Sequence, residues 1–192
     1  RHSPQHRTLD VAICMFDFGP TGVVRNALRI AAEAKAQGLA VELWVAQDSG
    51  SLRGDVPDGV PVHMLGRALG ARYSRGDRRR AGRAIVPVLA SLLESRRPAV
   101  LFSAGNHFHS VAAAAHRKAG GDTKLILRIS TGLPRPEQTL NPYRWMRFYH
   151  KRRKAERRHE GAARLVAVSE EIARELKRST DVRPEQLIVI PN

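Results

Sequence analysis

Residues 9–25 read LDVAICMFDFGPTGVVR, which places an apolar strand, a glycine-containing turn and a helix one after another. The uninterrupted apolar run VAICMF predicts a short buried strand over residues 9–16. Apolar side chains recur near helical spacing from Val24 onward, which predicts a helix over residues 21–37 that ends at Gly38. This order of strand, turn and helix is typical of a parallel α/β sheet.

The same alternation continues along the rest of the chain. Further strands are predicted at residues 41–46, 60–65, 100–103, 124–129, 164–168 and 187–190. Further helices are predicted at residues 75–94, 106–118, 143–160 and 169–177. We therefore predict an α/β fold: a Rossmann-like parallel sheet with helices on both faces, formed by residues 1–192 as a single domain.

Ligands of such sheets bind outside the carboxyl ends of the strands, so four loops are candidates for function. The first loop contains Gly19 and Gly22 but does not match the dinucleotide fingerprint G-x-G-x-x-G. No acidic residue stands where a ribose would need one, so an NAD-dependent dehydrogenase is disfavoured. Gly22 near a helix N-terminus allows an anion to approach the backbone, but an ordinary tight turn explains the same residues equally well.

The loop after the predicted strand 100–103 contains Asn106, His107 and His109. Two histidines without a nearby cysteine or carboxylate make a poor metal site, so we predict no metal. A histidine here can accept a proton from a substrate hydroxyl. The alternative is a helix cap formed by Asn106, beside imidazoles that face the solvent.

The other two loops each offer one candidate. Arg128 is a charged residue at the end of a buried strand, where a charge is usually functional or paired. Ser169 and Glu170 begin the last predicted helix. A helix cap followed by a first-turn acid that suits the helix dipole accounts fully for this pair.

Composition points to an anionic partner. The net charge is +15, which favours a membrane surface, a nucleic acid or a phosphorylated ligand as the partner. A GC-rich genome, in which arginine is simply common, gives the same excess of positive charge. The single cysteine, Cys14, lies in an apolar run and is predicted to be a buried thiol. Because this cysteine has no partner for an intrachain disulfide, we predict a cytoplasmic protein. We find no signal peptide and no apolar stretch of about 20 residues.

Three segments resemble a known family. Thr21–Arg25 is similar to a "GG-x-x-R" loop, Ala162–Glu171 resembles "AD-x-(I/V)-(I/V)-A-V-S-E", and Val189–Asn192 resembles "VIPNG". In this order, and over essentially the whole chain, they look like the N-terminal, acceptor-binding domain of retaining GT-B glycosyltransferases of family four (group 1). Thr21 replaces one glycine of the family's first loop.

The resemblance implies a transfer reaction. Family members move a sugar from a nucleotide-sugar to an acceptor hydroxyl with retention and without a required metal. It implies that Gly22 and Thr21 lie by the donor diphosphate, and that Asn106, His107 and His109 face the acceptor. Arg128 would hold an anionic acceptor group, while Ser169 and Glu170 would shape the cleft.

The resemblance also implies a missing half. The family's C-terminal domain binds the nucleotide-sugar through an E-x7-E motif, which this chain does not contain in the expected place. We therefore expect the parent reading frame to continue beyond Asn192, and we expect these 192 residues to be inactive alone. The full protein would be a bacterial hexosyltransferase of surface polysaccharide synthesis, acting on a glycan or lipid-linked acceptor.

The predicted helix 143–160 is strongly basic, with aromatic residues at i, i+3 and i+4. Such a helix suits a membrane interface, and a peripheral position on the inner face of the cell membrane follows. The predicted membrane contacts are Arg144, Trp145, Phe148, Lys151 and Arg152. A second basic cluster, residues 67–83, adds to this surface. The alternative is that the aromatic residues pack on the sheet.

A basic nucleic-acid or membrane-surface binding module without catalysis is the rival interpretation. The same helix can follow a phosphate backbone while its aromatic side chains stack on bases. The chain carries no recognisable nucleic-acid-binding motif, which makes nucleic acid the less favoured partner.

Overall fold

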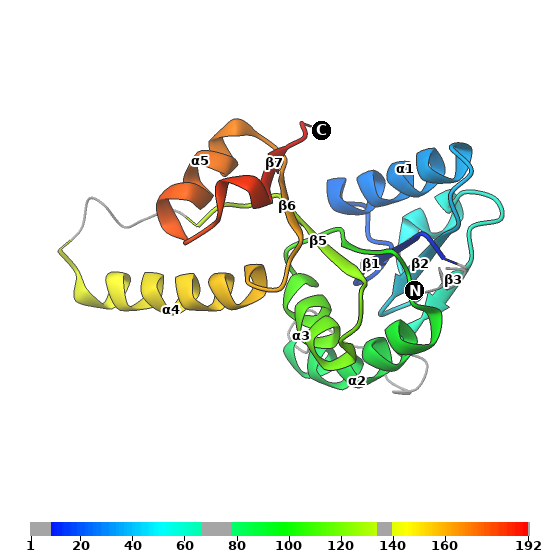
Figure 1. The fold of residues 1–192 in the computed structure, drawn as a ribbon, viewed down its shortest axis with the longest axis horizontal. Helices are drawn as coiled ribbons and strands as arrows, with labels where there is room; N and C mark the ends of the chain where they lie inside the picture. Colours follow the sequence, from blue (N-terminus) through cyan, green and yellow to red (C-terminus); the bar gives the residue numbers. More distant parts are fainter. Residues whose placement is uncertain (1–8, 67–77, 134–139, 192) are drawn as a thin grey trace, which may run out of the picture.

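The computed structural model describes residues 9–66, 78–133 and 140–191 and contains a seven-stranded parallel sheet. The strands lie in the order β3-β2-β1-β4-β5-β6-β7 (Figure 1). They are β1 (Val11–Met15), β2 (Val41–Val45), β3 (Val62–Met64), β4 (Val100–Ser103), β5 (Lys124–Ile129), β6 (Arg164–Ala167) and β7 (Leu187–Val189). All six pairings are parallel, which confirms the predicted Rossmann-like sheet.

Helices connect the strands. They are α1 (Gly22–Ala36), α2 (Arg78–Arg96), α3 (His109–Ala119), α4 (Pro142–His159) and α5 (Glu170–Ser179), with short 3-10 turns at η1 (Ser51–Asp55) and η4 (Pro184–Gln186). The thiol of Cys14 is fully buried, as predicted, and burial raises the pKa of Cys14 to about 12.

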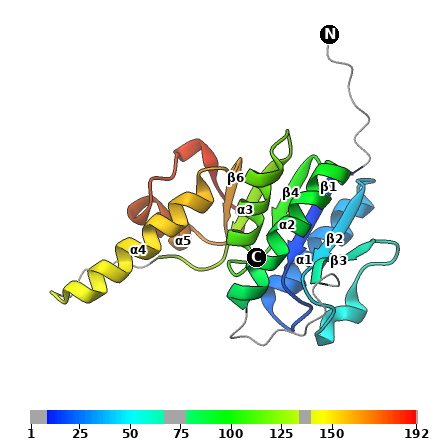
Figure 2. The same ribbon diagram turned by 90° about the horizontal axis from the view of Figure 1, so that it is seen from below.

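Two apolar cores form because alternate residues of each strand point to opposite faces of the sheet. Ile13 and Met15 of β1 pack with α1. Ala12 and Cys14, which alternate with them along the strand, belong to the core that α2, α3 and α5 complete. Helices therefore cover both faces. Helix α4 is different: only part of it lies near the sheet, and the rest extends away from the body of the domain (Figures 1 and 2).

Local sequence signals explain where two helices begin. The hydroxyl of Thr21 accepts a hydrogen bond from Val24 N, and that of Ser169 accepts one from Ile172 N. Both are N-caps, which use a side-chain oxygen to satisfy a backbone N–H group of the first turn. The predicted starts of these two helices are therefore correct to within one residue.

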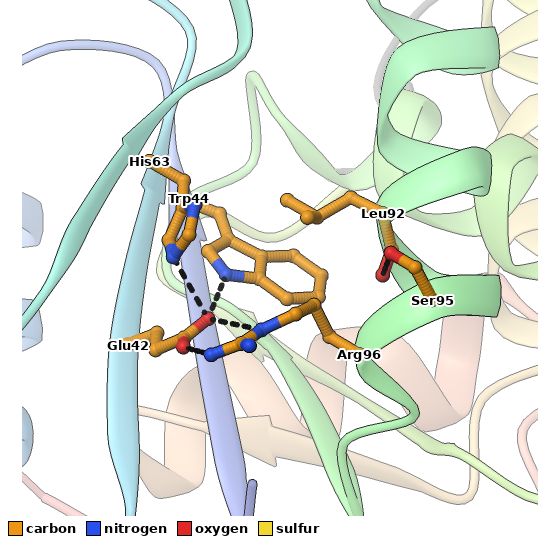
Figure 3. Close-up of polar contacts among 6 residues, drawn as sticks. All are labelled: Glu42, Trp44, His63, Leu92, Ser95 and Arg96. Atoms are coloured by element: carbon orange, nitrogen blue, oxygen red, sulfur yellow. Dashed lines mark hydrogen bonds and ion pairs between the residues drawn. The ribbon is translucent and has the colours of Figure 1, made fainter.

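A buried carboxylate joins β2, β3 and α2 on the face of the sheet that α2 covers (Figure 3). Glu42 is 3% exposed and accepts a hydrogen bond from Trp44 Nε1 at 2.9 Å. The same carboxylate pairs with the guanidinium of Arg96 and lies 3.1 Å from His63 Nε2. Because three elements supply these donors, Glu42 holds them together far from the carboxyl ends of the strands.

Backbone hydrogen bonds join the loop after β2 to the loop after β1. Phe18 N donates to Ser49 O at 2.8 Å, and Leu52 N donates to Phe18 O at 3.0 Å. Gly50 lies between these bonds with φ +124°, and a Cβ atom there would overlap the backbone of Phe18. The position therefore requires glycine both for its backbone conformation and for lack of space.

We expect Gly50→Ala to lower the free energy of unfolding by about 2 kcal/mol or more, because strain at such a φ adds to the overlap. Urea unfolding followed by tryptophan fluorescence measures this. Gly54→Ala is the matched control: Gly54 lies four residues away, has open space around it, and should change stability by less than about 0.5 kcal/mol. Equal effects of the two substitutions would contradict the prediction.

Candidate functional site

The strand order of the sheet reverses between β1 and β4. From β1 the chain continues to β2 and β3 on one side, and it then returns to β4 on the other side of β1. Such a switch point is where open parallel sheets bind ligands. The loops that leave the two strands touch here: a Cβ atom at Gly105 would lie 2.7 Å from Val23 Cγ1. The structure thus brings together the loops of Gly22 and of Asn106.

The loop after β1 presents an open helix N-terminus. Gly22 is exposed, and a Cβ atom there would meet no atom of another segment within 4 Å, so a ligand can approach the chain at this residue. The first N–H groups of a helix have no partner within it. Thr21 is exposed as well, but its hydroxyl already accepts from Val24 N. Contact between this loop and a donor diphosphate stays a prediction.

Asn106 does not cap α3, contrary to one of the two expectations for it. The helix begins at His109, its N-cap is Phe108, and no side chain bonds to its first turn. The Asn106 amide instead donates to Thr131 O at 3.3 Å and accepts from Ser130 N at 3.4 Å. It therefore joins the loop after β4 to the loop after β5.

The two histidines of this loop have opposite environments. His107 is exposed, while His109 is 2% exposed. His109 Nε2 donates to Arg128 O at 3.0 Å, which leaves Nδ1 to accept from the Ser103 hydroxyl at 2.7 Å. Burial and the nearby cation Arg158 lower the pKa of His109 to about 3. With both ring nitrogens bonded inside the protein, His109 does not fit the predicted catalytic role, and the role of the exposed His107 stays a prediction.

Arg128 is a buried residue of β5. Leu127 and Ile129 belong to the core beneath α2 and α3, so the side chain between them leaves from the opposite face of the sheet. Arg128 is 5% exposed, and burial lowers the pKa of its guanidinium. The side chain of Arg128 thus leaves the sheet on the face opposite to α3, while its backbone carbonyl contacts His109, and its role toward an acceptor stays a prediction.

Ser169 and Glu170 fit the simpler of their two interpretations. Ser169 caps α5, and Glu170 is an exposed acid of its first turn. An acidic side chain at this position is stabilised by the helix dipole. A direct contact of either residue with a substrate stays a prediction.

The predicted membrane contacts on α4 divide between its two sides. Phe148 is 4% exposed, so it packs inside the protein and the prediction for it is wrong. Trp145 is half-buried, and its ring lies 6.0 Å from that of Phe148 in an edge-to-face arrangement. Arg152 pairs with Glu156 and Asp181, which leaves Arg144 and Lys151 as exposed cations.

A hollow of about 770 Å³ lies between α2, α3 and α4, and we call it the basic groove. It contains the exposed His107 and the neighbouring Asn106 at the end nearest the carboxyl edge of β4. Among the described residues that line it, none is acidic. Its charged or titratable lining residues are Arg83, His107, His150, Arg153, Lys154, Arg157 and Arg158.

Sequence reasoning identified the cations of α4 but not this groove. The spacing of His150, Arg153, Lys154 and Arg157 is i, i+3, i+4 and i+7, which places them on one face of a helix. That pattern could have separated the groove face from the rest of the basic helix. Part of the second basic cluster, Arg67, Arg72 and Arg75, lies outside the described residues.

Neither a metal site nor a membrane-spanning helix occurs among the described residues. In the described parts of the chain, no three histidine, cysteine or acidic side chains gather as a metal site would require. Across the same residues, no helix is both long and apolar enough to cross a bilayer.

A parallel sheet of this order, with a groove opening at its carboxyl edge, is the architecture of a Rossmann-like domain from a GT-B glycosyltransferase. The family described as Glycosyltransferase Family 4 matches residues 20–192. The chain belongs to this family. No curated protein matches it significantly in overall sequence.

Solved structures show the same fold at low sequence identity. HepE from Anabaena, in complex with UDP and glucose, is 15% identical with a TM-score of 0.62, over 96% of this chain and 44% of that one. The lipopolysaccharide outer core galactosyltransferase WaaB in its apo form is 12% identical with a TM-score of 0.63, over 96% and 46%. Sucrose-phosphate synthase from Thermosynechococcus elongatus is 10% identical with a TM-score of 0.67, over 95% and 48%. The chain thus spans less than half the length of each.

Proposed function

We propose that this chain is the acceptor-binding half of a retaining hexosyltransferase, which moves a sugar from a nucleotide-sugar to a glycan or lipid-linked acceptor in bacterial surface polysaccharide synthesis. The observation that carries the proposal is the family match over residues 20–192. The open first turn of α1 at the switch point supports a donor phosphate there. The basic groove beside it supports an acceptor that carries negative charge.

Part of α4 supports a position on a membrane surface. Leu140, Tyr143 and Met146 are 100%, 62% and 62% exposed, and they lie at the end of α4 that extends away from the domain (Figure 2). The cations Arg144 and Lys151 are exposed on the same helix. Apolar and aromatic side chains beside cations suit the head-group region of an anionic bilayer.

The test of the proposed function uses the full-length protein. Purified protein is incubated with UDP-hexoses and candidate acceptors, and the anomeric configuration of the product is read by NMR. A product with the configuration of the donor supports the proposal. An inverted product contradicts the retaining mechanism, and the absence of transfer with every donor and acceptor contradicts the activity. The 192-residue chain, measured beside it, should transfer nothing.

We expect His107→Ala in the full-length protein to lower kcat by a factor of roughly 100 or more, because an exposed imidazole beside the acceptor would serve as general base. Binding of the nucleotide-sugar, measured by calorimetry, should not change. Lys118→Ala, an exposed position in the last turn of α3, is the control and should retain full activity. An unchanged kcat in His107→Ala would remove this residue from the site.

The rival function is a binding module without catalysis, and the charge of the basic groove is the observation that favours it. Binding to duplex DNA, single-stranded RNA and anionic vesicles, each over a series of salt concentrations, separates the two ideas. Strong binding to nucleic acid without binding to vesicles would support the rival and contradict the membrane position. Binding to vesicles alone would support the membrane position and contradict nucleic acid as the partner, and the transfer assay would then separate the transferase from a membrane-binding module without catalysis.

A further inference from the structure

Three arginines of the basic groove are not neutralised by any acid among the described residues. Arg83, Arg153 and Arg157 are exposed and form no ion pair with any described residue. Arg153 and Arg157 also border a neighbouring hollow that Glu156 and Asp181 line. The ion pairs of these two acids go to Arg152, so they leave Arg153 and Arg157 unpaired.

Arg158 adds a partly buried positive charge to the basic groove. It is only half exposed, lines the groove, and its Nε atom is buried without a hydrogen-bond partner in the described part of the chain. A buried donor without an acceptor is costly, and the cost is greater for a charged group. Because Nε itself is inaccessible, an anion in the groove would act on Arg158 through its charge, by offsetting the cost of burying the cation, and not through a bond to Nε.

The shape of the groove favours a compact, multiply charged group. A volume of about 770 Å³ is in the range of small-molecule sites, and three helices form its walls. Four guanidinium groups line it, more than a single carboxylate can neutralise. Arginine binds phosphate oxygens through paired N–H groups, so a diphosphate, with several oxygens and two or more charges, matches this lining best.

The same helical face continues from the groove to the apolar end of α4. Tyr143 and Met146 precede His150 and Arg153 at spacings of three and four residues, which keeps all four on one stripe. At 1.5 Å per residue, Met146 and Arg153 lie about 10 Å apart along the helix axis. An exposed apolar end beside a cationic hollow matches a lipid whose head group is a diphosphate.

We infer that the basic groove binds the diphosphate of a lipid-linked acceptor, whose hydrocarbon lies against Tyr143 and Met146. The identification of this ligand as an acceptor rests on the proposed function. Binding of the diphosphate itself requires neither a donor nor catalysis. The groove recognises the diphosphate, so a soluble diphosphate should also bind to it, without the contribution of the apolar end.

The first experiment titrates the 192-residue chain with inorganic pyrophosphate and, separately, with sulfate at equal ionic strength. We expect pyrophosphate to bind at least tenfold more tightly. The double variant Arg153→Ala/Arg157→Ala should weaken pyrophosphate binding by roughly 100-fold, because each guanidinium group contributes about tenfold through its charge-assisted hydrogen bonds. Both positions are exposed on a helix, so the fold should persist, and circular dichroism checks this.

The matched control removes the same charge elsewhere. Arg29 on α1 and Arg178 on α5 are exposed and do not line the groove, so Arg29→Ala/Arg178→Ala should change binding by less than threefold. Equal weakening in the two double variants would overturn the inference, because net charge alone would then explain binding. Pyrophosphate that binds no better than sulfate would overturn it as well.

The second experiment identifies the source of the diphosphate. Phosphatidylcholine vesicles that contain either a polyprenyl diphosphate or the corresponding polyprenol are sedimented with the chain. We expect recruitment only by the diphosphate, and Tyr143→Ser/Met146→Ser should abolish it while leaving pyrophosphate binding unchanged. Recruitment that does not depend on Tyr143 and Met146 would overturn the lipid assignment.

Failure of this inference and failure of the proposed function give different results. If the full-length protein transfers a sugar to a neutral glycan but the chain does not bind pyrophosphate, the groove assignment fails and the transferase stands. If pyrophosphate binds in the groove but the full-length protein transfers no sugar to any acceptor, the proposed function fails and the anion site stands.

Discussion

Glu42→Ala should lower the free energy of unfolding of this domain by about 2 to 3 kcal/mol, because it leaves a buried N–H donor without an acceptor and removes the carboxylate that two partly exposed side chains contact. The substitution leaves the buried indole N–H of Trp44 without its acceptor and leaves Arg96 without its carboxylate (Figure 3). It also removes the interaction that ties His63 on β3 to β2. Because native domains are stabilised by only about 5 to 15 kcal/mol, this is a large fraction of the total.

Urea unfolding followed by tryptophan fluorescence measures this effect, with Trp44 as a buried reporter. Glu94→Ala is the matched control, since Glu94 is an exposed acid on α2 and should contribute less than about 0.5 kcal/mol. Glu42→Gln, which keeps an acceptor for Trp44 but loses the charge, should fall between the two. A decrease for Glu42→Ala no larger than for Glu94→Ala would contradict a central role of this carboxylate in stability.

As the pH falls, the domain should begin to lose stability before the pH reaches the range in which carboxylates titrate. His109 and His159 are 2% and 5% exposed. Burial, and then the neighbouring cation Arg158, lowers the pKa of His109 to about 3 and that of His159 to about 4. The unfolded chain, with histidine pKa values of about 6.5, therefore binds more protons than the folded chain below that pH.

The sign of the effect follows from this difference in bound protons. Stability is fully present above about pH 6.5 and is lost as the pH falls toward the folded pKa values, by about 1 kcal/mol per pH unit for each histidine. The pair should cost roughly 3 kcal/mol between pH 6.5 and pH 5. Urea unfolding at half-unit intervals of pH measures the slope.

Single variants assign the slope to its residues. His109→Gln should reduce the slope by about half, whatever it does to stability at neutral pH. His150→Gln removes an exposed histidine and should leave the slope unchanged. A free energy of unfolding that stays constant between pH 6.5 and pH 5 would show that these two buried imidazoles do not control acid stability.

The sequence predicted the architecture well because its signals act over short distances. A strand of the type VAICM and a helix that begins after Thr21 or Ser169 depend on neighbours within a few residues. The seven strands, their parallel direction and both helix caps were therefore accessible without a structure. The family resemblance rested on segments of this same local kind, and the match over residues 20–192 confirms it.

The candidate site was accessible only in part. His107 and Asn106 were correctly placed in a loop at the carboxyl edge, since the end of β4 is a local feature. His109 has the same residue type, two positions further, yet it lies in the core with both ring nitrogens bonded. No local signal distinguishes the two, because burial depends on which element packs above.

The sequence by itself thus determined the order of strands and helices, the starts of two helices and the excess of positive charge, because these follow from neighbouring residues and from composition. The tertiary structure alone decided which face of α4 is buried, so that Phe148 turned inward while Arg153 and Arg157 lined a groove. It also decided that the side chain of Arg128 leaves the sheet on the face opposite to the one that α3 covers. The physical reason is that burial and charge pairing depend on contacts between segments distant in the chain, which form only when the sheet and its helices pack together.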